Sequence, residues 1–157
     1  MDRTEILERV QSKFEGLLTD VDLEGIDPRF SVAASDWLEI AGFLRNECEL
    51  NYLVCLTSID RGDGLEALYH LERLGEKRET LAVCIKVSYE TPEIPSVETV
   101  WRTADWHERE AFDLMGICFT GHHNLKRILC AEDWEGHPLR KDYKSPGRYH
   151  GIRNNVV

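Results

Sequence analysis

The sequence predicts an α+β domain of two layers, in which helices pack on one face of a mainly antiparallel sheet. Three strand-like runs follow one another in the middle of the chain, at residues 52–59, 65–74 and 79–89. Helical patterns stand before and after these runs. With 157 residues, the chain is long enough to bury roughly 70% of its unfolded surface in one core. We therefore expect a single domain over residues 1–143 and an extended C-terminal tail over residues 144–157.

The N-terminal part predicts a helix, a loop, a strand and a second helix. Apolar residues recur at helical spacing through residues 4–18, which is typical of an amphipathic helix. An acidic loop follows and leads to a short strand over residues 29–34. Asp36 with Glu39 forms a capping-box pattern at the start of a second helix, which continues to about Glu47. The apolar stripe of the first helix consists of Leu7, Val10, Phe14, Leu17 and Leu18.

The central runs carry the clearest β pattern of the chain. In the third run, apolar side chains alternate with small or polar ones from Thr80 to Tyr89, which indicates a strand with one buried face and one mixed face. Two short Gly-bearing connections, DRGDG and GEKR, favour an antiparallel meander. The strand over residues 29–34 is expected to join the same sheet.

A third helix is predicted from about Trp106 to Met115. Asp105 is the expected N-cap, Glu108 stands three residues later as the acid of a capping box, and Gly116 supplies the C-terminal stop. A short strand over residues 117–119 and a polar loop over residues 120–124 are expected to follow.

One side of this third helix combines Trp106 with the charged residues Arg109, Glu110 and Asp113. A solvated helix face rarely includes a tryptophan among charges, whereas protein interfaces use aromatic and arginine anchors together. One interpretation is that this face docks on another protein. The other is that Trp106 packs on a loop of the same chain and that Arg109 pairs with Asp113 at the i, i+4 spacing.

Glu108 stands at the edge of the apolar side of the helix and allows two interpretations. It is either the acid of the capping box, which the helix dipole favours in the first turn, or a partly buried carboxylate that needs a cationic partner. Arg127 and Arg140 are the candidate partners in the second interpretation.

Composition excludes several classes of function. The net charge is −10, with −11 on residues 1–100 and +1 on residues 101–157, so the body would repel phosphate and nucleic-acid binding is not expected. Five cysteines without a CxxC pair indicate small core residues of a reduced compartment. There is no apolar signal segment and no apolar run of membrane-spanning length. We therefore expect a cytosolic chain, or one that is peripheral on a membrane-bound assembly.

Six histidines are the main residues that suggest chemistry, but they lack HxxxH and HExxH spacing, so no metal site is expected. His122 and His123 are expected to be loop imidazoles that point apart. Nucleophile elbows, dinucleotide-binding fingerprints and P-loops are also absent from the sequence. We therefore expect no catalytic, cofactor-binding or metal-ligating residue. The competing hypothesis is a stand-alone hydrolase that uses Glu108, His137 and the paired histidines.

Two motifs in the C-terminal half carry a resemblance to a known family. The first comprises Glu108, Arg109, Glu110, Asp113, Leu114, Met115, His122, Lys126, Arg127 and Ile128. The second is GHPLRKDY at residues 136–143, which includes His137, Pro138, Arg140, Lys141, Asp142 and Tyr143. Together they resemble the hallmarks of the C-type subunit of the proton-pumping NADH:quinone oxidoreductases, respiratory complex I. The short length and the run IPSV at residues 94–97 are similar to the plastid and cyanobacterial form, also called the J-type subunit.

The resemblance implies a cofactor-free, non-catalytic subunit of the peripheral arm, on the cytoplasmic side of the inner (plasma) membrane. Its partners would be the D-type subunit, which shapes the quinone site, and the B-type subunit, which carries an iron-sulfur cluster. NAD, flavin, iron-sulfur clusters and quinone would belong to partner subunits. Contact with the membrane would be made only through the complex. A related complex with another electron donor, of the ferredoxin or membrane-bound hydrogenase type, stays open as an alternative.

The C-terminal tail has no helical or alternating period, and it contains too few large apolar residues to fix itself to the core. It nevertheless carries Arg148 and Tyr149, a pairing typical of interface anchors. By the resemblance, the tail wraps onto a neighbouring subunit. The residues expected to form the interface or its structural motif are Trp106, Glu108, Arg109, Glu110, Asp113, His122, Lys126, Arg127, His137, Pro138, Arg140, Lys141, Asp142, Tyr143, Arg148 and Tyr149.

Overall fold

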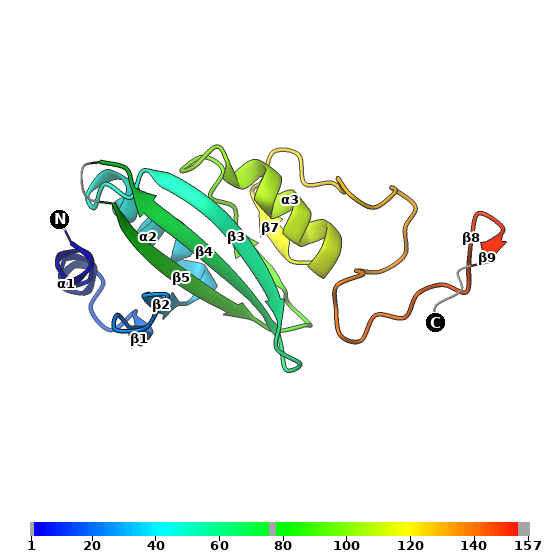
Figure 1. Cartoon of the computed structure of the whole chain (residues 1–157), viewed down its shortest axis with the longest axis horizontal. Coiled ribbons are helices and arrows are strands. Elements are labelled where there is room, and N and C mark those ends of the chain that lie inside the picture. Colours follow the sequence, from blue (N-terminus) through cyan, green and yellow to red (C-terminus); the bar gives the residue numbers. More distant parts are fainter. Residues whose placement is uncertain (1, 76–77, 154–157) are drawn as a thin grey trace.

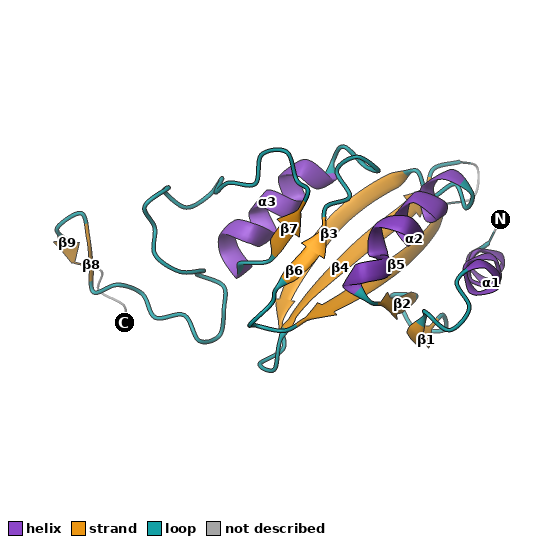
Figure 2. Cartoon of the chain, turned by 180° about the vertical axis from the view of Figure 1, so that it is seen from behind, coloured by secondary structure: helices purple, strands orange, loops and turns teal. Residues whose placement is uncertain are grey.

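The structure is a computed structural model that describes residues 2–75 and 78–153. Helix α2 lies across one face of a five-stranded sheet, α3 lies beside the edge strand β3, and the chain after β7 extends away from the body (Figures 1 and 2). In chain order, the elements are α1 (Arg3–Lys13), β1 (Thr19–Asp22), β2 (Arg29–Val32), α2 (Ala34–Asn46), β3 (Tyr52–Asp60), β4 (Leu65–Arg73), β5 (Glu79–Val87), β6 (Glu93–Pro95), α3 (Ala104–Met115), β7 (Cys118–Thr120), β8 (Arg148–Tyr149) and β9 (Ile152–Arg153).

The main sheet has the strand order β1-β2-β5-β4-β3. The meander β3-β4-β5 is antiparallel, and β2 pairs with β5 in the parallel sense, with Phe30 beside Val83. The α+β class and the mainly antiparallel sheet that the sequence predicts are thus confirmed. The predicted first strand joins this sheet, as expected.

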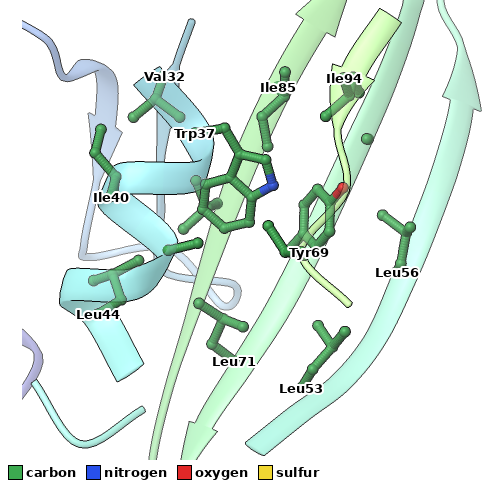
Figure 3. Close-up of a cluster of buried hydrophobic side chains, with 14 of the residues drawn as sticks. Val32, Trp37, Ile40, Leu44, Leu53, Leu56, Tyr69, Leu71, Ile85 and Ile94 are labelled. Carbon is green, nitrogen blue, oxygen red and sulfur yellow. The ribbon is translucent and has the colours of Figure 1, made fainter. Parts of the chain in front are cut away.

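The core lies between α2 and the sheet and is centred on Trp37 (Figure 3). The indole ring of Trp37 lies 4.6 Å from the ring centroid of Tyr69 on β4 and 6.2 Å from that of Trp101, which precedes α3. All three side chains are buried. Aromatic side chains bury large apolar areas, so this cluster joins α2, the sheet and the start of α3 into one core.

Helix α1 ends earlier than predicted, and α2 begins earlier than predicted but ends at the predicted place, with Glu47 as its C-cap. Helix α1 starts from a capping box formed by Asp2 and Glu5 and ends at Lys13, so the predicted last turn of the apolar stripe is not helical. Helix α2 has Ala33 at its N-cap position, without a side-chain hydrogen bond to the cap, so the predicted Asp36 capping box is wrong. The helix begins two residues before Asp36, which places that carboxylate inside the first turn.

Two short strands were not predicted from the sequence pattern. Strand β1 lies in the region predicted as an acidic loop, and all four of its residues are exposed, so it carries no apolar alternation. Strand β6 pairs in parallel with β7, where Ile94 stands beside Phe119. Both of these side chains are buried, and this small second sheet packs behind α3 as part of the same core.

Helix α3 also starts earlier than predicted. Its N-cap position is Thr103, and no side chain caps it, so Asp105 lies inside the first turn. The predicted end at Met115 is confirmed, with Gly116 in the left-handed conformation at φ 75°. No helix in the described part of the chain is both long and apolar enough to cross a bilayer.

Candidate functional site: the segment anchored on helix α3

The carboxylate of Asp113 fixes the chain that follows β7 to helix α3. Asp113 is fully buried, and its Oδ2 accepts the backbone N–H groups of Ile128 at 3.0 Å, Leu129 at 2.7 Å and Cys130 at 2.9 Å. Its Oδ1 lies 2.6 Å from Nη1 of Arg127. Burial by itself would raise the pKa of Asp113, but these N–H donors and the guanidinium lower it to about 2. The ionised Asp113 is therefore the anchor of this turn.

The last carbonyl groups of α3 have no partner within the helix, and residues of both motifs supply the missing donors. The side chains of Arg127 and His137 each donate to the carbonyl oxygen of Asp113, both at 3.0 Å, and the N–H of Leu139 donates to the carbonyl of Leu114 at 3.1 Å. The guanidinium of Arg127 is favoured at this end of the helix because the helix dipole is negative there.

Arg140 completes the cover over the end of α3. Its Nε donates to the carbonyl of Met115 at 2.6 Å, and its Nη2 lies 3.4 Å from the carbonyl oxygen of Gly116. A Cβ added at Gly116 would lie 2.5 Å from the ring of His137 and 2.7 Å from Nη2 of Arg140. The close approach and the positive φ both require glycine at this position.

The second motif is also tied to the main sheet. The backbone N–H of Lys141 donates to Oδ2 of Asp60 at the end of β3, at 2.8 Å, and the hydroxyl of Tyr89 donates to Oδ1 of the same carboxylate. The guanidinium of Arg140 lies 5.8 Å from the ring centroid of Tyr89. We call residues 126–143 the anchored segment, because it has no helix or strand of its own and is held by these contacts.

The predicted pairing of Glu108 with Arg127 or Arg140 is wrong. Glu108 is fully buried and accepts the N–H of Val97 at 2.8 Å and the hydroxyl of Ser96 at 2.5 Å. Burial raises its pKa to about 7, against the lowering effect of these two donors. The two arginines bind at the C-terminal end of α3, which is more than one turn away from Glu108. The capping-box interpretation is wrong as well, since the helix begins at Ala104.

The predicted docking face of α3 is only partly exposed. Arg109 is buried, with its Nε donating to the carbonyl of Lys126 at 3.3 Å, and its guanidinium lies 4.9 Å from the ring centroid of Trp106. Its predicted partner Asp113 pairs with Arg127 instead, so the i, i+4 pair is also wrong. Trp106 is 63% exposed and Glu110 is exposed, which leaves these two side chains on the surface.

The anchored segment presents apolar side chains to solvent from a fixed backbone. Leu129 and Leu139 are 62% and 60% exposed, although the N–H of each is bonded to α3. Lys126, Lys141 and Asp142 of the same segment are also exposed, whereas Pro138 and Tyr143 are half-buried. The structure thus divides the predicted interface residues into buried anchors and an exposed surface.

The paired histidines do not lie as predicted. The side chain of His122 is fully buried, while His123 is exposed, and their rings stack at a centroid distance of 5.3 Å and an interplanar angle of 12°. Glu98 and Asp105 approach both rings. No sequence pattern signals this cluster, because its members come from three separate segments.

The tail makes more contacts than predicted. Its β8-β9 hairpin lies at the far end of the extended C-terminal part (Figure 1), where the hydroxyl of Tyr149 and Nε2 of His150 bond to Asp133 at 2.8 and 2.7 Å. Trp134 packs on Tyr149 with ring centroids 5.0 Å apart. Arg148 is exposed, and residues 154–157 lie outside the described part.

Residues 30–149 match the family model described as "Respiratory-chain NADH dehydrogenase, 30 Kd subunit". The chain belongs to this family. It is 45% identical over 148 residues to the C-type subunit of the NADH-quinone oxidoreductase of Chloroherpeton thalassium, and 44% identical over 149 residues to that of Chlorobium phaeobacteroides. Each alignment covers 92% of this chain, and the chain spans 62% of the first relative and 90% of the second. The resemblance derived from the two motifs is therefore confirmed.

Two solved structures share the fold of this 30 kDa subunit family. The trypsin-resistant fragment (1-134) of Nqo5 superposes with a TM-score of 0.68 at 25% identity, over 80% of this chain and all of that one. A chain of the membrane-bound sulfane sulfur reductase, an archaeal respiratory membrane complex, gives a TM-score of 0.72 at 23% identity, over 90% of this chain and 85% of that one. The second likeness concerns the fold alone.

Several residues that matter in this 30 kDa subunit fold were missed by the sequence analysis. Asp60 follows a strand and resembles an ordinary turn acid, and Leu129 and Leu139 resemble ordinary loop residues. One signal could have indicated the two leucines. Leu139 lies inside the second family motif, and Leu129 directly follows the first. Glu98 had no signal of this kind.

Proposed function

We propose that this chain is a non-catalytic subunit of the peripheral arm of a proton-translocating NADH:quinone oxidoreductase, where it supports assembly and geometry. The observation that carries the proposal is the anchored segment, which holds Leu129 and Leu139 exposed on a backbone bonded to α3. Such a surface is ordered before a partner binds, so less conformational entropy is lost on association. Exposed apolar side chains among charged ones fit the composition of an interface core with a polar rim.

The absence of catalysis is supported by how the motif residues are used. Asp113, Arg127, His137 and Arg140 all bind groups of the same chain. A general base or a nucleophile needs free access to a substrate, and these side chains instead satisfy the end of a helix. Glu108 and His137, which the hydrolase hypothesis combines, bind different groups, at Ser96 and at the carbonyl of Asp113.

We further propose that the partners are the D-type subunit at the quinone site and the B-type iron-sulfur subunit. In this arrangement NAD, flavin, iron-sulfur clusters and quinone are bound by other subunits, and the chain is peripheral on the cytoplasmic side of the membrane. The family and the relatives of the C type support this proposal. The exposed Arg148 of the tail, with Tyr149 packed on Trp134, fits a second contact with a neighbouring subunit.

Affinity purification of the tagged full chain from its own host tests the proposal. We expect the complex to co-purify with NADH:quinone activity, and the chain released from it to have none. Recovery of a monomer that turns over a substrate by itself would favour the hydrolase. Recovery of a complex that oxidises a different electron donor would instead assign the chain to a related respiratory complex.

A further inference from the structure

Four side chains with metal-binding atoms meet beside the start of α3. Glu98 lies between β6 and α3, Asp105 lies in the first turn of α3, and His122 and His123 follow β7. One atom from each residue lies within 4.8 Å of the others. In the part of the chain that the structure describes, this is the only group of three or more potential ligands at such distances.

The separations between these atoms approach those of a four-coordinate ion. Nε2 of His122 lies 3.3 Å from Oδ1 of Asp105 and 3.6 Å from Oε2 of Glu98, and Nδ1 of His123 lies 2.6 Å from the same Oε2. A tetrahedral zinc ion with bonds of about 2.0–2.1 Å places its ligand atoms roughly 3.3 Å apart. Only the last separation must widen, and the exposed ring of His123 can move outward.

The surrounding chain holds the carboxylate of Glu98 in position and leaves one oxygen of Asp105 without a hydrogen bond. Glu98 is 4% exposed, and its Oε1 accepts the backbone N–H of His123 at 2.8 Å, so its Oε2 is aimed at the cluster. Oδ1 of Asp105 is buried and accepts no hydrogen bond from any described residue. A buried carboxylate oxygen without a donor needs another positive partner.

The charge of the surroundings favours a cation. A third carboxylate, that of Glu108, also lies near His122, with its Oε2 4.0 Å from Nε2 of that ring. No lysine or arginine among the described residues forms an ion pair with any of these three carboxylates. Three acids and two imidazoles therefore share a largely buried volume without a permanent positive charge.

We propose that Glu98, Asp105, His122 and His123 bind one divalent transition-metal ion, and that Zn²⁺ fits them best. Two imidazole nitrogens and two carboxylate oxygens are ligands that zinc accepts in tetrahedral geometry. Four protein ligands leave no open position, so the ion is structural. It ties the β6-α3 connection, the first turn of α3 and the loop after β7 together. Spacing along the sequence could not reveal it, because no two of its ligands stand in a recognised local motif.

Metal binding changes the tautomer of His122. In the structure, Nδ1 of His122 accepts the N–H of Asn124 at 3.0 Å, so Nε2 of the neutral ring carries the proton and donates it to the carbonyl oxygen of Asp105 at 3.1 Å. When Nε2 binds the ion, the proton is carried by Nδ1, which then no longer accepts the exposed backbone N–H of Asn124, and water becomes the acceptor of that N–H. This exchange gives the site a signature in the ¹⁵N spectrum of His122 that a merely structural histidine lacks.

The test uses the full chain purified without a histidine tag, titrated calorimetrically with ZnCl₂ alone. We expect one equivalent to bind to the wild type, and His123→Ala and Glu98→Gln to weaken binding by at least about tenfold, since even outer-shell changes cost that much. His150→Ala is the matched control, because His150 is also exposed and also bonds a carboxylate, at 2.7 Å to Asp133. It should leave binding unchanged.

Two further readouts keep the result independent of variant folding. Zinc should raise the melting temperature of the wild type, because a ligand that binds only the folded state stabilises it. The ¹⁵N resonances of His122 should change from an Nε2-protonated to an Nδ1-protonated pattern. A wild type that binds no Zn²⁺ in large excess, or a His123→Ala variant that is folded and binds as tightly, overturns the proposal. Loss of binding in His150→Ala alone would do the same, because the ion would then be bound by the tail.

Discussion

Nη1 of Arg127 lies 2.6 Å from Oδ1 of Asp113, and the same nitrogen donates to the carbonyl oxygen of Asp113 at 3.0 Å. One guanidinium group thus neutralises a fully buried carboxylate and satisfies a helix end. Nη2 of Arg127 continues to the carbonyl of Gly136 at 2.8 Å, where the second motif begins. The two motifs are therefore parts of one structural unit.

Replacing Asp113 with Asn should destabilise the fold by about 3 kcal/mol, because it leaves a buried ion pair without one partner. Asn also offers one acceptor oxygen where the carboxylate serves three backbone N–H groups and Arg127. Chemical denaturation measures the change. Glu110→Gln, an exposed acid on the same helix, is the control and should stay within about 0.5 kcal/mol of the wild type.

The lowered pKa of Asp113 predicts a specific sensitivity to acid. Its folded-state pKa of about 2 lies below the unfolded value of about 3.9, so its contribution is fully present above the unfolded value. That contribution is lost as the pH falls through the folded value. The difference in unfolding free energy between the wild type and Asp113→Asn should therefore narrow over this window. A difference that stays constant with pH would contradict the assignment.

Gly116→Ala should cost more than about 1 kcal/mol, since it introduces a strained positive φ and a contact at 2.5 Å with His137. Gly42→Ala in α2 gives the opposite expectation, because its Cβ meets nothing within 4 Å. That variant should stabilise the chain by roughly 0.5–1 kcal/mol, as alanine does in a helix interior. Melting curves of the two variants, recorded together, compare both effects.

Glu108→Gln should change the unfolding free energy by less than about 1 kcal/mol, because the amide can accept the N–H of Val97 and donate to the hydroxyl of Ser96. Glu108→Leu leaves both groups buried without a partner, at about 1–3 kcal/mol for each unsatisfied group. If Glu108→Gln proved as damaging as Glu108→Leu, the charge itself would be essential to the fold.

Leu139→Asp should leave the melting temperature of the isolated chain nearly unchanged, since the side chain is 60% exposed. Its incorporation into the complex should fall about tenfold, as for loss of an interface hot spot. Leu74→Asp is the control, because Leu74 is 48% exposed just after β4, away from the anchored segment. Quantitative co-purification from the host measures how much of each variant is incorporated into the complex. Equal incorporation of the two variants would place the interface elsewhere.

The periodic elements of this chain could be predicted because their signal is local. The strict alternation in β5 and the short connections of the meander predicted the sheet, and Gly116 predicted the end of α3. Strand β1 could not be predicted, since it is fully exposed and is formed only by pairing with β2. The predicted starts of α2 and α3 were wrong. Asp36 and Asp105 are residues of the type that caps helices, but the N-caps in the folded chain are Ala33 and Thr103.

The sequence by itself determined the fold class, the family and the polar residues of the two motifs, because residue type, order and spacing carry that information. Only the tertiary structure decided the partners of those residues, and it alone revealed Asp60 and Glu98. Asp113 binds Arg127 across 14 positions, and Asp60 binds the N–H of Lys141 across 81. Glu98 meets His123 across 25 positions. A buried charge takes the donor that the packed chain brings within hydrogen-bond reach, and that distance is set by the fold of the whole core rather than by any stretch of sequence.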